Sequence, residues 1–257
     1  MKKIAIIIPA YNEERRIGKT LEEYSRYFED IIKEGIIDYE ILVVINNTRD
    51  GTEEIVKFFA DKNNKISYIN LERGGKGFAV IEGFKRALIN SENYFIGFTD
   101  ADMATRPDEF FKLVVACKKS DGAIADRYGK KSKIYPKPSI KRLLAKRAFN
   151  ILSRSLLLLP FKDTQCGAKV FRRDALERVI PYLSMSEWAF DVELLYHLKK
   201  NKFLVTSVPI VWIDEEYSKI NFWKSGPWMA LGIVRLRLLN SPMKNIIKIY
   251  DLWNKNG

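Results

Sequence analysis

Short apolar runs alternate with amphipathic segments through the first half of this 257-residue sequence. Each run spans five or six residues, which suits a buried strand, and the segments between them have apolar residues at helical spacing. The predicted strands are 4–8, 40–45, 65–70, 94–99 and 122–126, and the predicted helices are 13–33, 52–61, 77–89 and 107–119. Strands that alternate with helices predict an α/β fold with a mainly parallel sheet flanked by helices.

The second half continues this pattern less regularly. Its predicted elements are a helix at 139–159, a strand at 167–171, helices at 174–182 and 188–199, and a strand at 203–208. The Lys- and Pro-rich segment 130–138 is expected to be a mobile connector. A hydrophobic content of 47% is ample for one large core. We place the main domain at residues 1–215, with an amphipathic insertion at about 130–162, followed by amphipathic helices at 216–257.

Two acidic residues, Asp100 and Asp102, stand at the end of the predicted strand 94–99. Ligands of open α/β sheets bind at the carboxyl ends of the strands, so both carboxylates are expected at a ligand site. Carboxylate oxygens suit Mg²⁺ or Mn²⁺, and these ions in turn suit a diphosphate. An acid pair that only caps the following helix is the alternative, and the pair alone does not decide between the two.

Polar residues and a glycine-rich loop occupy other strand ends. Asn12 and Glu13 follow the first strand, where they suit either the start of a helix or contacts to a nucleoside. The loop Arg73-Gly74-Gly75-Lys76-Gly77 precedes a predicted helix. It is not a Walker A loop, because the required glycine spacing and the Ser or Thr are missing. Its backbone N–H groups and Lys76 can still reach a diphosphate.

The net charge of +12 is concentrated in residues 118–173, which hold 16 Lys and Arg against 3 Asp and Glu. Such a segment usually meets phosphates, in nucleic acid or in anionic lipid. The run Leu156-Leu157-Leu158-Leu159 beside it favours lipid over nucleic acid, so no nucleic-acid partner is expected.

The predicted helix 139–159 is two-sided. One face would carry Ile140, Leu144, Ala148, Ile151, Leu152 and Leu159, and the other Arg142, Lys146, Arg147, Asn150 and Arg154. Charges inside the apolar stretch disfavour a membrane-spanning helix and favour one lying in the lipid interface. A helix packed on the domain is the alternative. The tail 220–253 mixes Trp, Leu and Arg, which also favours a helix on the membrane surface.

The beginning of the sequence and its cysteine content bear on the compartment. Residues 1–3 lead directly into the first strand without the apolar core of a signal peptide. Two cysteines make a disulfide framework improbable. We therefore expect a peripheral protein on the cytoplasmic face of the membrane.

The order of these motifs resembles the inverting family-2 glycosyltransferases of the GT-A fold, a Rossmann-like fold that binds nucleotide sugars. The similarity is greatest to the branch that glucosylates dolichyl phosphate and to polyprenyl-phosphate relatives, over residues 3 to 240. It is carried by Pro9-Ala10-Tyr11-Asn12-Glu13, Gly75-Lys76-Gly77, Asp100-Ala101-Asp102-Met103-Ala104-Thr105, Asp163-Thr164-Gln165-Cys166-Gly167 and Trp188-Ala189-Phe190-Asp191-Val192-Glu193-Leu194-Leu195.

This resemblance implies a role for each matching residue. The substrate-binding set would be Pro9, Tyr11, Asn12, Glu13, Asn46, Lys76, Asp100, Ala101, Arg127 and Gln165. Asp102, with Asp100, would hold Mg²⁺ or Mn²⁺, while Lys76 and Arg127 would meet phosphate. Asp191 would lie near the donor sugar and the acceptor, positioning them rather than removing a proton.

The implied reaction moves glucose from UDP-glucose to dolichyl or polyprenyl phosphate. Relatives that transfer mannose have a metal-binding Gln where this chain has Ala104, which favours glucose. An Asp that often contacts the base is replaced by Asn46, which can still accept a hydrogen bond from uracil. Three alternatives stay open: GDP-mannose as donor, a saccharide hydroxyl as acceptor with Asp191 as base, and a homodimer in which the lipid-facing segments pack together.

Overall fold

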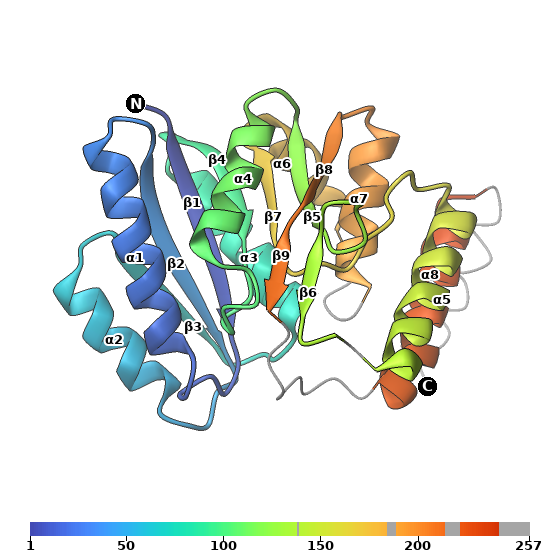
Figure 1. Cartoon of the computed structure of the whole chain (residues 1–257), viewed down its shortest axis with the longest axis horizontal. Helices are drawn as coiled ribbons and strands as arrows, with labels where there is room; N and C mark the ends of the chain where they lie inside the picture. The colour runs from blue at the N-terminus through green and yellow to red at the C-terminus, as the bar shows by residue number, and fades with distance from the viewer. Residues whose placement is uncertain (138, 184–188, 214–221, 242–257) are drawn as a thin grey trace, which may run out of the picture.

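A seven-stranded sheet forms the centre of the chain in the computed structural model, which describes residues 1–137, 139–183, 189–213 and 222–241 (Figure 1). The strands lie in the order β3-β2-β1-β4-β7-β5-β8, and only β7 runs antiparallel to its neighbours. Their bounds are β1 Lys3–Ala10, β2 Asp38–Asn46, β3 Ile66–Leu71, β4 Asn93–Phe98, β5 Gly122–Asp126, β7 Lys169–Arg172 and β8 Val205–Pro209. The predicted α/β fold with a mainly parallel sheet is confirmed.

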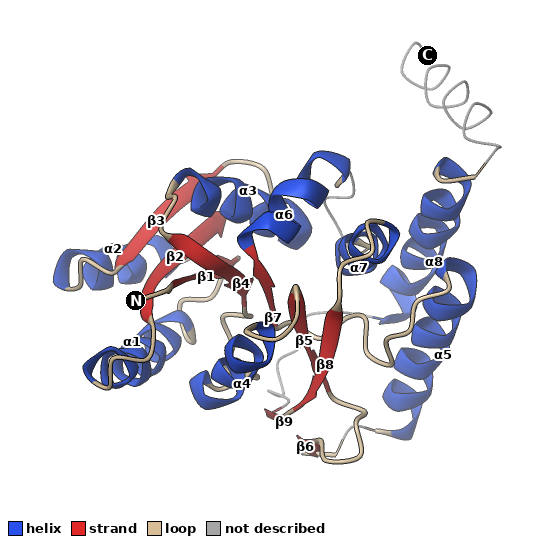
Figure 2. Cartoon of the chain, turned by 90° about the horizontal axis from the view of Figure 1, so that it is seen from above, coloured by secondary structure: helices blue, strands red, loops and turns tan. Residues whose placement is uncertain are grey.

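Helices cover both faces of this sheet (Figure 2). Their bounds are α1 Ile17–Lys33, α2 Thr52–Lys62, α3 Lys76–Ile89, α4 Pro107–Cys117, α5 Ile140–Leu157, α6 Arg173–Val179, α7 Phe190–Lys200 and α8 Phe222–Leu239, with a 3₁₀ turn at Ile180–Tyr182. Helices α1, α2 and α4 pack in one apolar cluster, whereas α3, α6 and α7 pack in the other together with α5 and α8.

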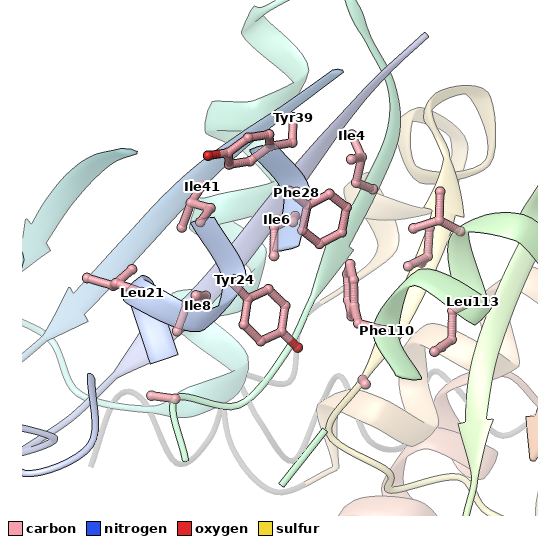
Figure 3. Packing of buried hydrophobic residues seen from close by; sticks show 14 of the residues in the cluster. Ile4, Ile6, Ile8, Leu21, Tyr24, Phe28, Tyr39, Ile41, Phe110 and Leu113 are labelled. Atoms are coloured by element: carbon pink, nitrogen blue, oxygen red, sulfur yellow. The ribbon is translucent and has the colours of Figure 1, made fainter. Parts of the chain in front are cut away.

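Strand β1 lies between the two clusters and contributes to both. Ile4, Ile6 and Ile8 point toward α1 and α4, where they meet the rings of Phe28 and Phe110 (Figure 3). Alternate residues such as Ile7 point into the other cluster. Because both faces of a parallel sheet are covered, its strands read as unbroken apolar runs rather than as alternating ones.

Helix α1 begins at Ile17, four residues later than predicted. The residues before it bond instead to the loop after β2. The backbone N–H groups of Asn12 and Glu13 donate to the hydroxyl oxygens of Thr48 and Thr52, at 2.9 and 2.7 Å. Asn12 has a φ of 53°, so it does not cap the helix as its residue type suggested.

The segment 130–138 is not simply a connector. It contains β6 (Lys133–Tyr135), which pairs in parallel with β9 (Val211–Ile213) in a separate two-stranded sheet. The hydroxyl of Ser132 donates to the backbone oxygen of Asp126 at 2.5 Å and fixes the start of this segment. The prediction of a mobile connector was therefore wrong for residues 132–135, and Pro138 lies outside the described residues.

Helices α5 and α8 lie side by side at one end of the molecule (Figures 1 and 2). Among the α5 residues whose burial the structure describes, the buried ones are Phe149, Asn150, Ser153 and Leu157. On the predicted apolar face, Leu144 is 60% and Ile151 is 61% exposed, as expected of a face that meets lipid, whereas Leu159 just beyond the helix is buried. Asn150, predicted on the polar face, is buried and accepts hydrogen bonds from the N–H and hydroxyl of Thr164.

Among the helices that the structure describes, none combines the length and apolarity that a bilayer crossing needs. The predicted boundary at residue 216 lies outside the described residues, as do the start of the helix predicted at 188 and the tail from residue 242 onward. Cys117 and Cys166 are both buried and free.

Candidate active site

Asp100 and Asp102 lie in the loop between β4 and α4, at the carboxyl end of the central strands. Two side chains of helix α1 hold this loop by hydrogen bonds to its backbone. The hydroxyl of Thr20 donates to the backbone oxygen of Ala101 at 2.7 Å, and that of Tyr24 donates to the backbone oxygen of Thr105 at 2.8 Å. Both hydroxyls are buried, so the loop that carries the acid pair is held by the core.

The two carboxylates repel each other. Burial, followed by the charge of Asp100, raises the pKa of Asp102 to about 6. The N–H of Ala104, which donates to Asp102 at 3.0 Å, and the nearby Arg16 and Lys76 act in the opposite direction. A divalent cation bound to the two carboxylates would offset this repulsion and stabilise their charged forms.

Lys76 is the first residue of α3 and forms an ion pair with Oδ1 of Asp100. Burial by itself would lower the pKa of Lys76, but the carboxylates of Asp100, Asp191 and Asp102 outweigh it and raise this pKa above its ordinary value. Lys76 therefore brings an ammonium group from the first position of α3 to the acid pair. The sequence prediction that Lys76 and the acids meet in one place agrees with these contacts.

The segment 163–169, which leads into β7, passes close to the acid pair. Gly167 leaves no room for a side chain, because a Cβ built there would lie 1.8 Å from Oδ2 of Asp100. Glycine is therefore required by the close approach of Asp100 to the backbone. Gln165, predicted near the donor sugar, is partly buried in the same segment.

Arg127 forms an ion pair with Asp163 that the sequence analysis did not predict. Its Nε and Nη2 donate to the two carboxylate oxygens of Asp163 at 2.7 and 2.9 Å, and its backbone N–H adds a third bond at 3.1 Å. The side chains of Arg127 and Asp163 are 8% and 0% exposed. The arginine thus links the end of β5 to the 163–169 segment, and its contact to phosphate stays a prediction.

Asp191 lies in the first turn of α7 and pairs with Lys169, a lysine on β7 that the sequence analysis did not select. The distance from Nζ of Lys169 to Oδ1 of Asp191 is 2.5 Å. The one sequence signal for Lys169 was a charged residue inside a buried apolar strand. The structure therefore brings Asp191 into the neighbourhood of Lys76 and the acid pair.

The residues predicted around the nucleoside lie at the ends of β1 and β2. Pro9 is near the end of β1, Tyr11 is 47% exposed, and Asn46 is 2% exposed as the last residue of β2. The carboxylate of Glu13 accepts from Nε and Nη2 of Arg16 at 2.6 and 2.7 Å. Since β1 and β2 are adjacent and parallel, these positions share one edge of the sheet with the acid pair.

This donor set suits a divalent metal held largely by its substrate. Within the described part of the chain, no group of three His, Cys, Asp or Glu side chains converges on one point. Two carboxylates with mutual repulsion are nevertheless what Mg²⁺ uses when a diphosphate and water supply its other ligands. Asp100 and Asp102 therefore fit the predicted Mg²⁺ or Mn²⁺.

Comparison with solved structures relates this architecture to known enzymes. Glucosyl-3-phosphoglycerate synthase from Mycobacterium tuberculosis, in complex with Mn²⁺, uridine-diphosphate and phosphoglyceric acid, aligns with a TM-score of 0.65 at 17% identity. The alignment covers 92% of this chain and 78% of that one. At this level of identity, the likeness establishes the fold, which is the GT-A fold of glycosyltransferases.

Sequence comparison identifies the family. The profile of glycosyl transferase family 2 matches residues 5–180. The dolichyl-phosphate beta-glucosyltransferase of Dictyostelium discoideum is 30% identical over 244 residues, which cover 91% of this chain and 73% of the relative. The human protein of the same name is 31% identical over 254 residues, covering 93% and 76%. The chain therefore belongs to glycosyl transferase family 2 and is a glycosyltransferase with the GT-A fold.

Proposed function

We propose that this enzyme transfers glucose from UDP-glucose to dolichyl phosphate or another polyprenyl phosphate, with inversion at the anomeric carbon. Relatives of 30–31% identity over nine-tenths of the chain bear the name of that activity. The observation that carries the proposal is the meeting of the Asp100–Asp102 pair with Lys76 at the N-terminus of α3. This arrangement suits a departing nucleoside diphosphate.

Each part of this site has a task on the leaving group. A bound Mg²⁺ or Mn²⁺ would neutralise charge on the diphosphate as a Lewis acid, held by Asp102 with Asp100. Lys76 and the backbone N–H groups at the start of α3 provide further positive potential at the same place. The structure of the mycobacterial neighbour, which contains Mn²⁺ and uridine-diphosphate, supports this choice of metal and nucleotide.

Glucose is favoured over mannose by the loop after the acid pair. Ala104 is 1% exposed, and its backbone N–H and oxygen bond to Asp102 and to the N–H of Ile213. No side-chain ligand for a metal is available at this position. Asn46, buried at the end of β2, supplies an amide for uracil in place of a carboxylate.

The acceptor does not need a strong general base. A phosphate monoester has a second pKa near about 6, so at neutral pH it is already mostly dianionic. Asp191 is held by Lys169, which suits a carboxylate that positions substrates. The protein accelerates the reaction by alignment of the phosphate oxygen with the anomeric carbon, a contribution that can be large.

A lipid-linked acceptor requires a membrane surface beside the site, and the pair α5 and α8 is suited to supply it. Leu144, Ile151 and Leu158 are exposed on α5 and just beyond it, and Leu231 and Val234 are exposed on α8. Arg147 and Arg237 are also exposed there. Apolar side chains among basic ones bind the headgroup region of an anionic bilayer. We place the enzyme peripherally on the cytoplasmic face.

Incubation of the purified protein with one labelled donor and one acceptor at a time tests the proposal. The donors are UDP-glucose, GDP-mannose and UDP-GlcNAc, and the acceptors are dolichyl phosphate and a soluble saccharide. We expect label to enter the organic phase from UDP-glucose with dolichyl phosphate, and EDTA to abolish this transfer. Label from GDP-mannose would assign the mannosyl activity instead. Transfer to the saccharide alone would refute the lipid acceptor.

A further inference from the structure

Lys169 carries a charge in a fully buried place. Its side chain is 0% exposed in the middle of the sheet. An ammonium group that loses its hydration needs close partners, and an apolar residue of similar size would usually cost less at such a position. Its Nζ donates to the backbone oxygen of Cys166 at 2.7 Å and to Oδ1 of Asp191 at 2.5 Å. The buried charge of Lys169 is therefore best explained by its bonds to Asp191 and to the backbone of Cys166.

The position of Lys169 connects two sides of the site. In the antiparallel pair β4–β7, it lies opposite Phe98, two residues before Asp100. Its Nζ is 5.2 Å from the centre of the Phe98 ring. Gly167, two residues earlier, presses against Asp100. One short segment, 166–169, thus touches Asp100 through Gly167 and Asp191 through Lys169.

The charges form an alternating row across this segment. Asp191 has a side chain that is only 14% exposed, pairs with Lys169, and also attracts the ammonium group of Lys76. Lys76 in turn pairs with Asp100. If Lys169 lost its charge, Asp191 would lose its hydrogen-bonded counter-charge and would share Lys76 with Asp100. Its negative charge would then act more strongly on an anionic acceptor. Like charges in a partly buried site repel strongly, because water screens them poorly.

We propose that Lys169 is a positioning residue, which acts through Asp191 to set where the acceptor phosphate is held relative to the Asp100–Asp102 pair. By compensating Asp191, it also removes a repulsion between that carboxylate and the phosphate. The inference rests on the proposed transfer to a phosphate acceptor. It concerns acceptor use and not nucleotide binding, and this separation makes it testable.

The substitution Lys169→Met removes the charge and keeps the length of the side chain. With dolichyl phosphate as acceptor, we expect KM for the acceptor to rise about tenfold and kcat to fall on the order of 100-fold, as for a misplaced reacting group. Binding of UDP with Mn²⁺, measured by calorimetry, should change less than about threefold. In the double variant Lys169→Met with Asp191→Asn, the repulsion from an unpaired carboxylate is absent, so KM for the acceptor should return toward the unsubstituted value. The positioning carboxylate is also lost, so kcat should stay low.

Lys3→Met is the matched control. The Lys3 side chain is 15% exposed and pairs with Glu40 at 2.7 Å, at the start of β1 and therefore at the opposite end of the sheet from the acid pair. We expect this variant to lose stability in urea without a change in kcat or in either KM. It shows what the loss of a largely buried lysine does by itself.

Three results would overturn the inference. The first is unchanged acceptor kinetics in Lys169→Met. The second is a loss of UDP binding equal to the loss of kcat together with a lower unfolding midpoint, which would make the role purely structural. The third is a double variant whose acceptor KM is as high as that of Lys169→Met. If the unsubstituted enzyme transferred nothing to dolichyl phosphate, the proposed function would fail, and this inference with it.

Discussion

Replacement of Gly167 by alanine would put a methyl group where the carboxylate of Asp100 now lies. The added Cβ would be 1.8 Å from Oδ2 and 2.5 Å from Cγ of Asp100, whereas real Cβ contacts begin near 3.0 Å. The carboxylate must therefore retreat by about 1.2 Å. Because a displacement of about 1 Å at a reacting centre can cost roughly 100-fold, we expect kcat/KM for glucosyl transfer to fall on the order of 100-fold.

Folding should be affected far less than activity. The Asp100 side chain is 25% exposed, so it can rotate toward solvent without disturbing the core. Gly18→Ala in α1 is the matched control, since its Cβ would meet Ile55 and Phe59 at 3.5 and 3.6 Å, an ordinary contact. It should stabilise the helix by about 0.5–1 kcal/mol and leave transfer unchanged.

The assay compares initial rates of lipid-linked product for both glycine variants, together with thermal unfolding and calorimetric binding of UDP with Mn²⁺. A folded Gly167→Ala enzyme with the kcat/KM and the nucleotide affinity of Gly18→Ala would refute the account. It would mean that the position of Asp100 does not matter for the site.

Three further variants test other parts of the molecule. Asp102→Asn should abolish transfer and leave vesicle binding intact, and unchanged turnover would contradict the metal assignment. Without metal, this variant should unfold at a higher temperature than the unsubstituted enzyme, because burial and the charge of Asp100 destabilise the charged form of Asp102. Burial lowers the pKa of His197 to about 4, so the unfolded chain binds more protons below pH 6.5. Urea unfolding should show a loss of about 2 kcal/mol between pH 7 and about pH 5 that His197→Gln removes, and the same loss in that variant would contradict it. Leu144→Ser with Ile151→Ser should weaken binding to anionic vesicles about tenfold or more without affecting UDP binding, and equal sedimentation with vesicles would exclude this face.

The sequence was sufficient for the main strands because a parallel sheet buried on both faces leaves long apolar runs. It did not reveal β6 and β9, which are three residues each and are stabilised by pairing with each other across the chain. The start of α1 was also wrong. Residues 12–14 have the composition of a helix start, but they bond to residues 48–52, which lie about 36 positions away.

The acid pair could be predicted because a strand end fixes the edge at which its side chains appear. The partners of Arg127 and Asp191 could not, since Asp163 and Lys169 are 36 and 22 residues away along the chain. Helix α5 follows its predicted faces only in part, since Leu144 and Ile151 are exposed whereas Leu159, just beyond it, is buried. Its orientation was beyond the sequence, because packing against α8 and the bond of Asn150 to Thr164 decide which face is buried.

A crystal soaked with UDP and Mn²⁺, with data collected at the manganese absorption edge, tests the central claim most directly. We predict one anomalous peak at coordination distance from Asp102, with the diphosphate beside Lys76 at the start of α3. A manganese peak elsewhere, or a diphosphate bound away from both residues, would contradict the assignment of this site.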